Sequence, residues 1–585
     1  MKHTKKLMML TLILVLALVS ACSKSDDNGN GGSAGNNGKA GSDAAADNNG
    51  KAAANADKAG NAGNAAPADI NAKYDPPITV TAVRDQDASI AFKEGEDFDN
   101  NNWTKAYQDE LGITIKHNWI VPSDQYDAKL NIAIASGDLP DIFKVNGSQL
   151  KQLVDAGMLA DLTDVYQNYA SELTKNAIES GPLAKAAATF DGKLMAIPPD
   201  ESGYEGGLNL LFLRSDWMEK LNLAKPTTWA ELETVMDAFV NQDPDGDGKK
   251  DTFGLALTKD LYKNGVAEST GVFNAFGSHP NIWIEGADGT IVYGGIQPET
   301  KTALAKLQEM YKKGWIDPEF GVKDSGKVGE DFANNKVGVD FGALWNPLWP
   351  LQDSVTKNPT ANWSVSPAVS ATGAPVQYSA DLSFNEFMVV NKKMKNPEAF
   401  IKLMNFGNDK LYGGTADPNV FHSEKVGDKQ YDHFKMNVVI VGGSNPIGGN
   451  FGHYKKVTAA LAANDPAGLN PEQKDYYDKI VSFNGGDRTN WGTMRVFGPD
   501  SAYSTIEGVY QNKEQNLKFT KFYGAPTKTM AAKKSTLDKM QLETFTKIIL
   551  GGPIDEFDKF VADWKKLGGD QITQEVNDWS AQQSK

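Results

Sequence analysis

Ser136-Gly-Asp-Leu-Pro-Asp-Ile-Phe143 is a turn followed directly by a short apolar run, the pattern of a buried strand. In the flanking sequence, similar apolar runs of strand length alternate with stretches whose apolar residues recur near helical spacing. Short strands that alternate with helices are typical of an α/β domain with largely parallel strands. We expect strands at 78–84 and 113–119 and helices at 102–111 and 126–135.

A clear helix is predicted to begin at Thr228. Thr228 and Glu231 have the spacing of a capping box, and the apolar residues that follow recur on one helical face. Trp229 belongs to that face, so we expect it in the core. Further strands are expected at 209–214, 334–341 and 384–391, and further helices at 302–312, at 397–406 and at the C-terminus.

The N-terminus has the pattern of a secretory signal peptide over residues 1–21. Three lysines precede the apolar run Leu7–Val19, which is shorter than the roughly 20 residues that a spanning helix needs. Ser20-Ala21-Cys22 resembles the lipobox of bacterial lipoproteins, which implies cleavage before Cys22 and a diacylglycerol on its thiol. The alternative is a plain secretory peptide with an unpaired cysteine. Cys22 is the only cysteine, so the chain can form no intrachain disulfide.

Residues 22–75 are expected to form a flexible tether, because apolar side chains larger than alanine are absent up to Pro67. From Pro76 onward no second apolar run approaches membrane length, so this part is expected to be soluble and globular. The 585 residues allow two or more domains. A net charge of −16 argues against nucleic-acid binding, which needs a positive surface.

Several motifs of the globular part together resemble the family 1 extracellular solute-binding proteins, and among them the large lipoproteins of Gram-positive bacteria. Each motif is short, and the resemblance depends on their order and spacing across residues 76–585. The matching stretches are Ser136-Gly-Asp-Leu-Pro-Asp-Ile-Phe, Ala156-Gly-Met-Leu-Ala-Asp-Leu-Thr, Asp191-Gly-Lys-Leu-Met-Ala-Ile-Pro, Leu213-Arg-Ser-Asp-Trp-Met-Glu-Lys-Leu, Lys225-Pro-Thr-Thr-Trp, Lys313-Gly-Trp-Ile-Asp-Pro-Glu-Phe, Gly524-Ala-Pro-Thr-Lys-Thr-Met and Asp563-Trp-Lys-Lys-Leu-Gly-Gly-Asp.

The resemblance implies a two-lobe, periplasmic-binding-protein-like α/β fold with hinge strands and an interlobe cleft. By analogy the chain crosses between the lobes near 198–210, 384–391 and 518–527. Lobe one is then expected to hold residues 76–200 and 391–518, and lobe two residues 205–385 and 525–585.

Asp243-Pro-Asp-Gly-Asp-Gly-Lys-Lys-Asp251 has the spacing of an EF-hand-like calcium loop. Gly248 lies at the sharp turn, and Gly254 occupies the place of the last glutamate, so the bidentate ligand is missing. The alternative is a solvated turn that ends a helix. A bound calcium ion would be a structural brace, with Asp243, Asp245, Asp247, the Lys249 carbonyl and Asp251 as its ligands.

A sugar site needs flat aromatic faces and a few planar polar groups, and aromatic residues in Gly-, Asn- and Pro-rich loops are the candidates for it. The segments 341–350 and 488–495 fit best, and we expect their tryptophans to face each other from the two lobes. The candidate ligand-binding residues are Trp345, Asn346, Trp349, Trp491, Arg495, Tyr204, Glu201, Asp381 and Trp283.

The resemblance implies an extracellular, lipid-anchored, monomeric binding protein that passes an oligosaccharide to ABC permease subunits and their ATPase. A peptide or a modified sugar is an alternative cargo, and a sensor that feeds a membrane receptor would share the fold. A surface carbohydrate-active enzyme is the alternative from another class, but from Pro76 onward the sequence contains no His-Glu-x-x-His, Gly-x-Ser-x-Gly or phosphate-loop motif.

Overall fold

The computed structural model describes residues 70–86, 90–179, 182–198, 208–262, 265–381, 386–426, 429–439 and 449–583. The predicted signal peptide, Cys22 and most of the predicted tether lie outside the described residues, as do Glu201 and Tyr204. Among the helices that the structure describes, none is both long and apolar enough to cross a membrane.

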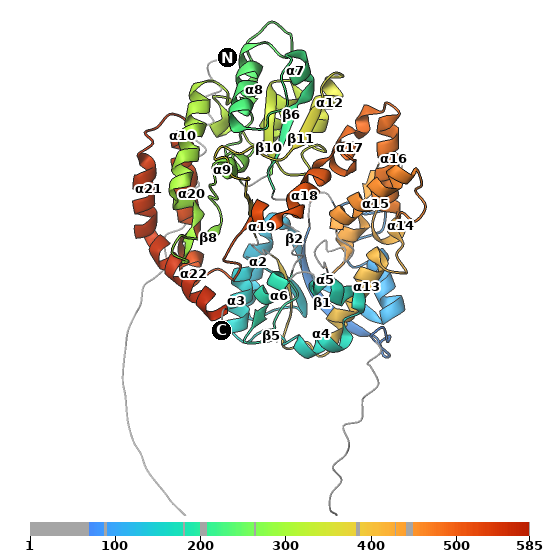
Figure 1. Cartoon of the computed structure of the whole chain (residues 1–585). Coiled ribbons are helices and arrows are strands. Elements are labelled where there is room, and N and C mark those ends of the chain that lie inside the picture. Colours follow the sequence, from blue (N-terminus) through green and yellow to red (C-terminus); the bar gives the residue numbers. More distant parts are fainter. Residues whose placement is uncertain are drawn as a thin grey trace, which may run out of the picture. The chain divides into compact units, whose positions relative to one another are not determined.

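The first lobe is built on a four-stranded sheet of order β13-β3-β1-β2. Strands β1, β2 and β3 run parallel, and β13 runs antiparallel to β3. Helices surround this sheet in the lower half of Figure 1. The strands are β1 (Ile78–Gln86), β2 (Ile113–Pro122), β3 (Ile142–Val145) and β13 (Phe387–Val390). The helices are α1 (Asn102–Ala106), α2 (Tyr126–Ser136), α3 (Gly147–Asp155), α4 (Thr163–Tyr169), α5 (Glu172–Glu179), α6 (Pro182–Ala187), α13 (Glu398–Tyr412) and α14 (Pro418–Phe421).

The second lobe is built on a sheet of order β11-β6-β10-β7, in which β6 runs antiparallel to both neighbours. Its strands are β6 (Leu210–Arg214), β7 (Phe253–Leu255), β10 (Val337–Gly342) and β11 (Trp363–Ser366). Its helices are α7 (Ser215–Lys220), α8 (Trp229–Asn241), α9 (Thr270–Ala275), α10 (Pro298–Lys312), α11 (Ser325–Ala333), α12 (Leu351–Lys357), α20 (Lys528–Ile549), α21 (Glu556–Trp564) and α22 (Asp570–Gln583).

Short strand pairs complete the lobes and the connections between them. They are β4 (Thr189–Phe190) with β5 (Lys193–Leu194), β8 (Trp283–Glu285) with β9 (Ile291–Tyr293), β12 (Tyr378–Ala380) with β16 (Leu517–Phe519), and β14 (Glu424–Val426) with β15 (Lys429–Tyr431). The remaining helices are α15 (Gly449–Ala463), α16 (Pro471–Asn484), α17 (Trp491–Phe497), α18 (Ala502–Gln511) and α19 (Lys513–Asn516).

Local sequence signals account for several of these elements. The α8 helix begins at the predicted capping box, where Thr228 accepts a hydrogen bond from the Glu231 N–H and the Glu231 side chain accepts one from the Thr228 N–H. Trp229 is buried in the core, as predicted. The expected helix at 102–111 starts as α1 and continues as a π-helical turn from Tyr107 to Leu111.

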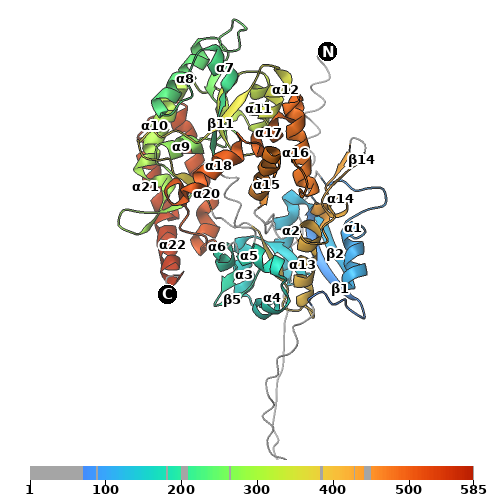
Figure 2. The same cartoon turned by 45° about the vertical axis from the view of Figure 1, so that its right-hand side comes forward.

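The expected lobe boundary differs from the observed packing in one region. We expected residues 391–518 to complete lobe one, and Met394–Val439 does contribute to the core of that lobe. Residues between Tyr454 and Leu517 contribute instead to the core of lobe two. Figures 1 and 2 both show α17 beside α12. Amphipathic spacing reveals which helix face is buried but not which partner covers it, so the sequence pattern could not assign these helices.

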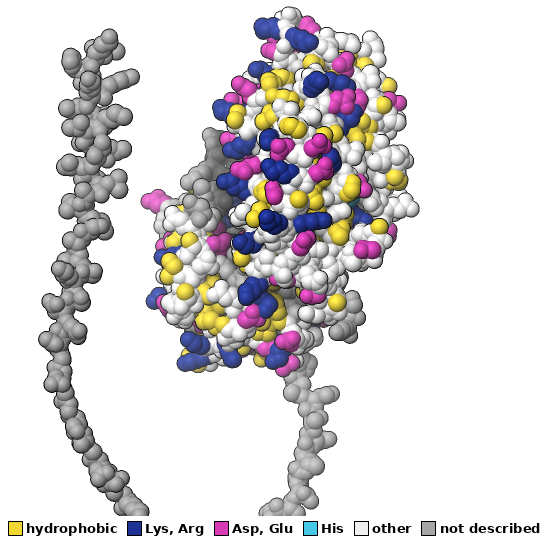
Figure 3. Space-filling view, turned by 90° about the vertical axis from the view of Figure 1, so that its left-hand side faces the viewer, with side chains coloured by type: hydrophobic (Ala, Val, Ile, Leu, Met, Phe, Trp, Pro, Cys, Tyr) yellow, Lys and Arg dark blue, Asp and Glu magenta, His cyan; other side chains and the backbone are white. Residues whose placement is uncertain are grey.

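The surface on the side of α10, α20 and α21 carries charges of alternating sign (Figure 3). Lys301 of α10 pairs with Asp558 of α21 at 2.6 Å, and Lys547 pairs with Glu556 at 3.2 Å. Such exposed pairs add little stability, but mixed charges keep the electrostatic field of this face weak.

Candidate functional site

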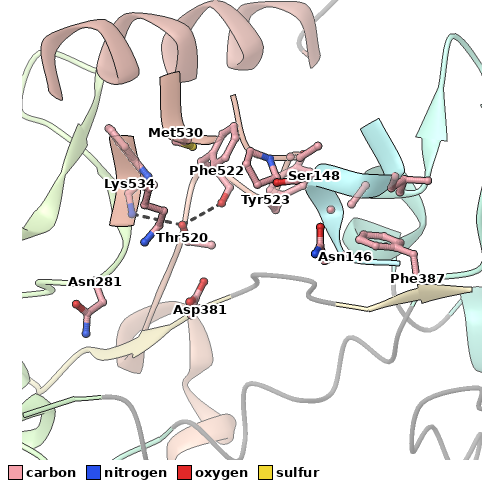
Figure 4. A pocket seen from close by; sticks show the side chains of 17 residues that line it. Asn146, Ser148, Asn281, Asp381, Phe387, Thr520, Phe522, Tyr523, Met530 and Lys534 are labelled. Carbon is pink, nitrogen blue, oxygen red and sulfur yellow. Dashed lines mark hydrogen bonds between the residues drawn. The ribbon is translucent and has the colours of Figure 1, made fainter. Parts of the chain in front are cut away.

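A pocket of about 450 Å³ is lined by residues from both lobes and from the segments that connect them (Figure 4). Its volume falls in the range of small-molecule sites. The polar side chains that line it are Asn146, Ser148, Asn281, Asp381, Thr520 and Lys534, and the aromatic and large aliphatic ones are Leu150, Trp283, Phe387, Phe522, Tyr523 and Met530.

Two paired strands place the polar residues at the centre of the pocket. Strands β12 and β16 pair in parallel, so their carboxyl ends meet at the same edge. Asp381 follows β12 directly and Thr520 follows β16 directly, and the Thr520 N–H donates to the Ala380 carbonyl at 3.0 Å. Parallel pairing therefore places two polar residues side by side that are far apart in the sequence, and the pocket opens beyond the strand ends, as is usual in α/β folds.

The first lobe contributes residues from the end of strand β3. Asn146 follows β3 and caps α3, because its side-chain oxygen accepts a hydrogen bond from the Gln149 N–H at 3.0 Å. This bond uses the amide oxygen, and among the described residues no acceptor is recorded for the NH₂ group of Asn146, which can therefore donate to a ligand. Phe387, the first residue of β13, pairs with Val145 and so lies beside Asn146 at the pocket edge.

The second lobe contributes Trp283 and Asn281. Trp283 is only 8% exposed, and its ring packs against Tyr293 with 5.3 Å between ring centroids. Its backbone is hydrogen-bonded to the segment that follows β16, because the Lys521 N–H donates to the Trp283 carbonyl at 2.8 Å. The buried Gln541 of α20 donates from Nε2 to the Pro280 carbonyl at 3.2 Å, which fixes the backbone next to Asn281 at the pocket edge.

This arrangement combines aromatic faces with planar amides, hydroxyls and one carboxylate. Aromatic faces pack against apolar ring surfaces, and the polar groups can exchange hydrogen bonds with ligand hydroxyls. Because both lobes supply contacts, a ligand in this pocket would bind best when the lobes are close together.

Two of the predicted ligand residues, Trp283 and Asp381, line this pocket. Trp345, Asn346, Trp349, Trp491 and Arg495 lie elsewhere, and Glu201 and Tyr204 are outside the described residues.

The predicted pairing of Trp491 with Trp345 and Trp349 across a cleft is corrected by the structure. Trp491 is fully buried in α17, packed within the core of lobe two, and its indole N–H donates to Asn362 Oδ1 at 3.0 Å. Arg495, one helical turn later, donates to the Asp500 carbonyl at 3.1 Å. Burial lowers the pKa of Arg495 below its usual value. The sequence suggested a loop here, but the segment forms a short helix whose tryptophan faces inward.

Asn346 is a buried support for the loop that carries Trp345 and Trp349. Its side-chain NH₂ donates to Asp340 Oδ2 at 3.0 Å, and the Ala267 N–H donates to Asp340 Oδ1 at 3.1 Å. Asp340 is completely buried. Burial raises its pKa to about 7, with a further contribution from the nearby Glu268 carboxylate, although these hydrogen bonds oppose the shift.

The expected calcium loop does gather three carboxylates. Oxygens of Asp243, Asp245 and Asp247 lie within 4.8 Å of one another. Gly246 and Gly248 have φ values of 81° and 79°, which favour glycine, and their N–H groups donate to the two oxygens of Asp243.

The charges around this loop are crowded. Partial burial and the neighbouring Asp243 and Asp247 raise the pKa of Asp245. The Lys249 ammonium pairs with Asp247 at 2.6 Å and lowers the pKa of that carboxyl. Asp251 is not a member of the three-carboxylate group, and the predicted roles of Asp251 and the Lys249 carbonyl remain predictions.

Sequence reasoning missed most of the pocket, including Asn146, Asn281, Phe387, Phe522 and Tyr523. A signal was present for the last two, because they are aromatic residues in a Gly- and Pro-containing stretch at the third expected crossing. Asn146 and Gln149 have the spacing of a capping box, which predicts a helix start but not its exposure to a pocket.

Two α/β lobes, paired connecting strands and a pocket lined from both lobes define a two-lobe ligand-binding protein. Residues 92–410, more than half of the chain, match the family described as bacterial extracellular solute-binding protein. The chain therefore belongs to the bacterial extracellular solute-binding proteins, and it is a binding protein rather than an enzyme.

Relatives of known name agree with this assignment. The chain is 31% identical over 241 residues to the polygalacturonan/rhamnogalacturonan-binding protein YtcQ of Bacillus subtilis, and this match covers 40% of the chain and 44% of YtcQ. It thus spans less than half the length of that relative. It is 24% identical to the lipoprotein LipO of Bacillus subtilis over 81% of the chain and 87% of LipO.

Solved structures share the fold. The substrate-binding protein FusA of Streptococcus pneumoniae in complex with kestose has a TM-score of 0.57 and 17% identity, covering 87% of this chain and 99% of FusA. A structure of the FusA EF-hand mutant has a TM-score of 0.56 and 16% identity, with the same coverage.

Proposed function

We propose that this chain is the carbohydrate-binding component of an ABC importer and that it captures an oligosaccharide in the pocket between its lobes. The observation that carries the proposal is the meeting of Trp283, Phe522 and Tyr523 with a rim of amides, hydroxyls and the Asp381 carboxylate. Relatives support the sugar class, since YtcQ is named for polygalacturonan and rhamnogalacturonan and FusA for fructooligosaccharides.

The pocket would act by shifting a hinge equilibrium. A sugar that packs on Trp283 of lobe two and bonds to Asn146 of lobe one would favour the closed arrangement of the lobes. The paired strands β12 and β16 lie at the pivot of this movement. Stacking and hydrogen bonding leave the glycosidic bonds intact, so the cargo would be released unchanged to permease subunits.

We infer that the protein is held outside the cell membrane by a lipid on Cys22, with residues 22–75 as a tether, and that it works as a monomer with membrane permeases and their ATPase. The lipobox-like sequence and the similarity to LipO support the anchor. We also propose that the 243–251 loop binds a structural calcium ion, which the three clustered carboxylates and the EF-hand of FusA support.

Direct binding measurements test the sugar proposal. Trigalacturonic acid, a rhamnogalacturonan fragment and kestose would be titrated into the protein by calorimetry. We expect at least one to bind and to remain chemically intact after long incubation. Failure of all these sugars to bind, or the release of fragments from the bound sugar, would overturn the proposal.

A pair of matched variants locates the site. Asp381→Asn should weaken binding of that sugar by about tenfold to a hundredfold, because a hydrogen bond to a charged group contributes on the order of 1.5–3 kcal/mol and 1.4 kcal/mol is a factor of about ten. Asp578→Asn makes the same chemical change at an exposed position of α22, outside the pocket, and should leave affinity unchanged. Equal affinity of wild type and Asp381→Asn would place the sugar elsewhere.

A further inference from the structure

The aromatic wall of the pocket is backed by a single side chain from the C-terminal helix. The Trp579 ring of α22 packs edge-on against Phe522, with 4.9 Å between centroids and 73° between ring planes. It packs in the same way against Tyr523, at 4.8 Å and 87°. Phe522 and Tyr523 line the pocket (Figure 4). Trp579 is not one of the residues that line it.

The backbone after these two residues also lies directly against the indole. A Cβ atom on Gly524 would lie 2.6 Å from Trp579 Nε1, which is closer than atoms in contact can approach. Only glycine therefore lets the chain pass so near the ring. Trp579 thus lies against three successive residues, 522–524, all of which line the pocket, without lining it itself.

Trp579 is itself held firmly by the second lobe. Ile572 and Val576 bury the inner face of α22 in the core of that lobe. Asn577 exchanges two hydrogen bonds with the Ile291 backbone of β9, at 2.9 and 2.8 Å. Glu575 accepts a hydrogen bond from the Thr529 hydroxyl at 2.7 Å. The ring is therefore a fixed support behind a segment that has no regular secondary structure between Phe519 and Lys528.

We propose that Trp579 is a positioning residue for ligand binding, which orients Phe522 and Tyr523 for stacking on a sugar ring without touching the sugar. The inference rests on the proposed function. A ring that stacks on a ligand gains most when its orientation is already set before binding, because no side-chain freedom is then lost. Edge-to-face contacts from one support to two neighbouring rings provide such an orientation.

The test measures the affinity of each sugar named above by calorimetry for a set of variants of the full chain. Trp579→Ala should weaken binding by about tenfold, whereas Trp579→Phe should stay within about threefold of wild type, because a smaller ring preserves part of the edge contact. Gly524→Ala should weaken binding as well, since the added methyl group pushes the segment off the ring. Ile572→Val is the matched control on α22, because it should lower the melting temperature and leave affinity unchanged.

A combined variant separates positioning from general stability. In a chain that already carries Phe522→Ala and Tyr523→Ala, adding Trp579→Ala should cause no further loss of affinity, because the rings that it orients are gone. A further loss there, or unchanged affinity in Trp579→Ala alone, would overturn the inference. Unchanged affinity in the Phe522→Ala, Tyr523→Ala chain would also overturn it. If wild type binds none of the sugars, the proposed function itself fails.

Discussion

The buried carboxyl of Asp340 offers a quantitative test of the structure. Its folded-state pKa is raised from 3.8 to about 7, chiefly by burial, so the fold favours the protonated acid. A raised pKa contributes stability that is fully present below pH 3.8 and is lost as the pH rises through 7. The charged form is costly because Asp340 has no cation partner in the described structure, and the Glu268 carboxylate lies nearby.

Asp340→Asn removes the ionisation and keeps the shape. The asparagine oxygen can still accept from the Ala267 N–H. The Asn346 amide can turn over, so that its Oδ1, which has no hydrogen-bond partner among the described residues, accepts from the new NH₂ group. The free energy of unfolding of wild type should fall by about 1.4 kcal/mol for each pH unit between pH 5 and the folded-state pKa of about 7. Wild type should therefore lose about 3 kcal/mol of stability between pH 5 and pH 8, and the variant should not.

The assay is urea denaturation of both proteins at pH 5 and pH 8, followed by tryptophan fluorescence. Subtracting the variant from wild type at each pH removes the titration of all groups that they share. Asp138→Asn, the same change at an exposed position of the first lobe, is the control and should give no such difference. Identical differences between wild type and Asp340→Asn at both pH values would refute the raised pKa.

Three further predictions concern other parts of the chain. Calcium should raise the melting temperature of wild type and a chelator should reverse this, whereas the melting temperature of Asp245→Ala should not respond. A wild-type melting temperature that is the same with calcium and with chelator would contradict the calcium proposal. Arg214→Leu should lower the free energy of unfolding, measured by urea denaturation, by about 3 kcal/mol. The reason is that Asp216 loses both of its hydrogen bonds from the buried Arg214 guanidinium. A loss below about 1 kcal/mol would show that this ion pair contributes little to stability. Wild type should partition into the detergent phase and Cys22→Ser should not be lipidated, so identical partitioning of both into the aqueous phase would contradict the anchor.

The predictions that came true depend on residues close together in the chain. The capping box at Thr228 and Glu231 spans a single helical turn, so its hydrogen bonds follow from local geometry. The aspartates of the 243–251 loop are likewise brought together by a few residues and two glycines. The alternation of strands and helices, together with the family motifs, was sufficient to predict two α/β lobes.

Predictions about surfaces were less successful, because a tryptophan in a Gly- and Asn-containing stretch can be either exposed or buried. Trp491 turned inward, since α17 lies against lobe two and Asn362 accepts its indole N–H. Asn346 turned inward too, toward the buried Asp340. Both residues have side chains that suit a sugar site, and only their packing partners show that they support the core.

The sequence by itself determined the fold class and the acidic loop, because each is encoded by local spacing or recognisable motifs, and the export signal stays a prediction from composition. The binding pocket was decided only by tertiary structure. Asp381 and Thr520 become neighbours through the parallel pairing of β12 with β16, and Trp579 reaches Phe522 and Tyr523 because α22 packs against β9 and α20. Such contacts join residues that are distant along the chain, and which of many apolar faces meet depends on the packing of the whole core rather than on any local pattern.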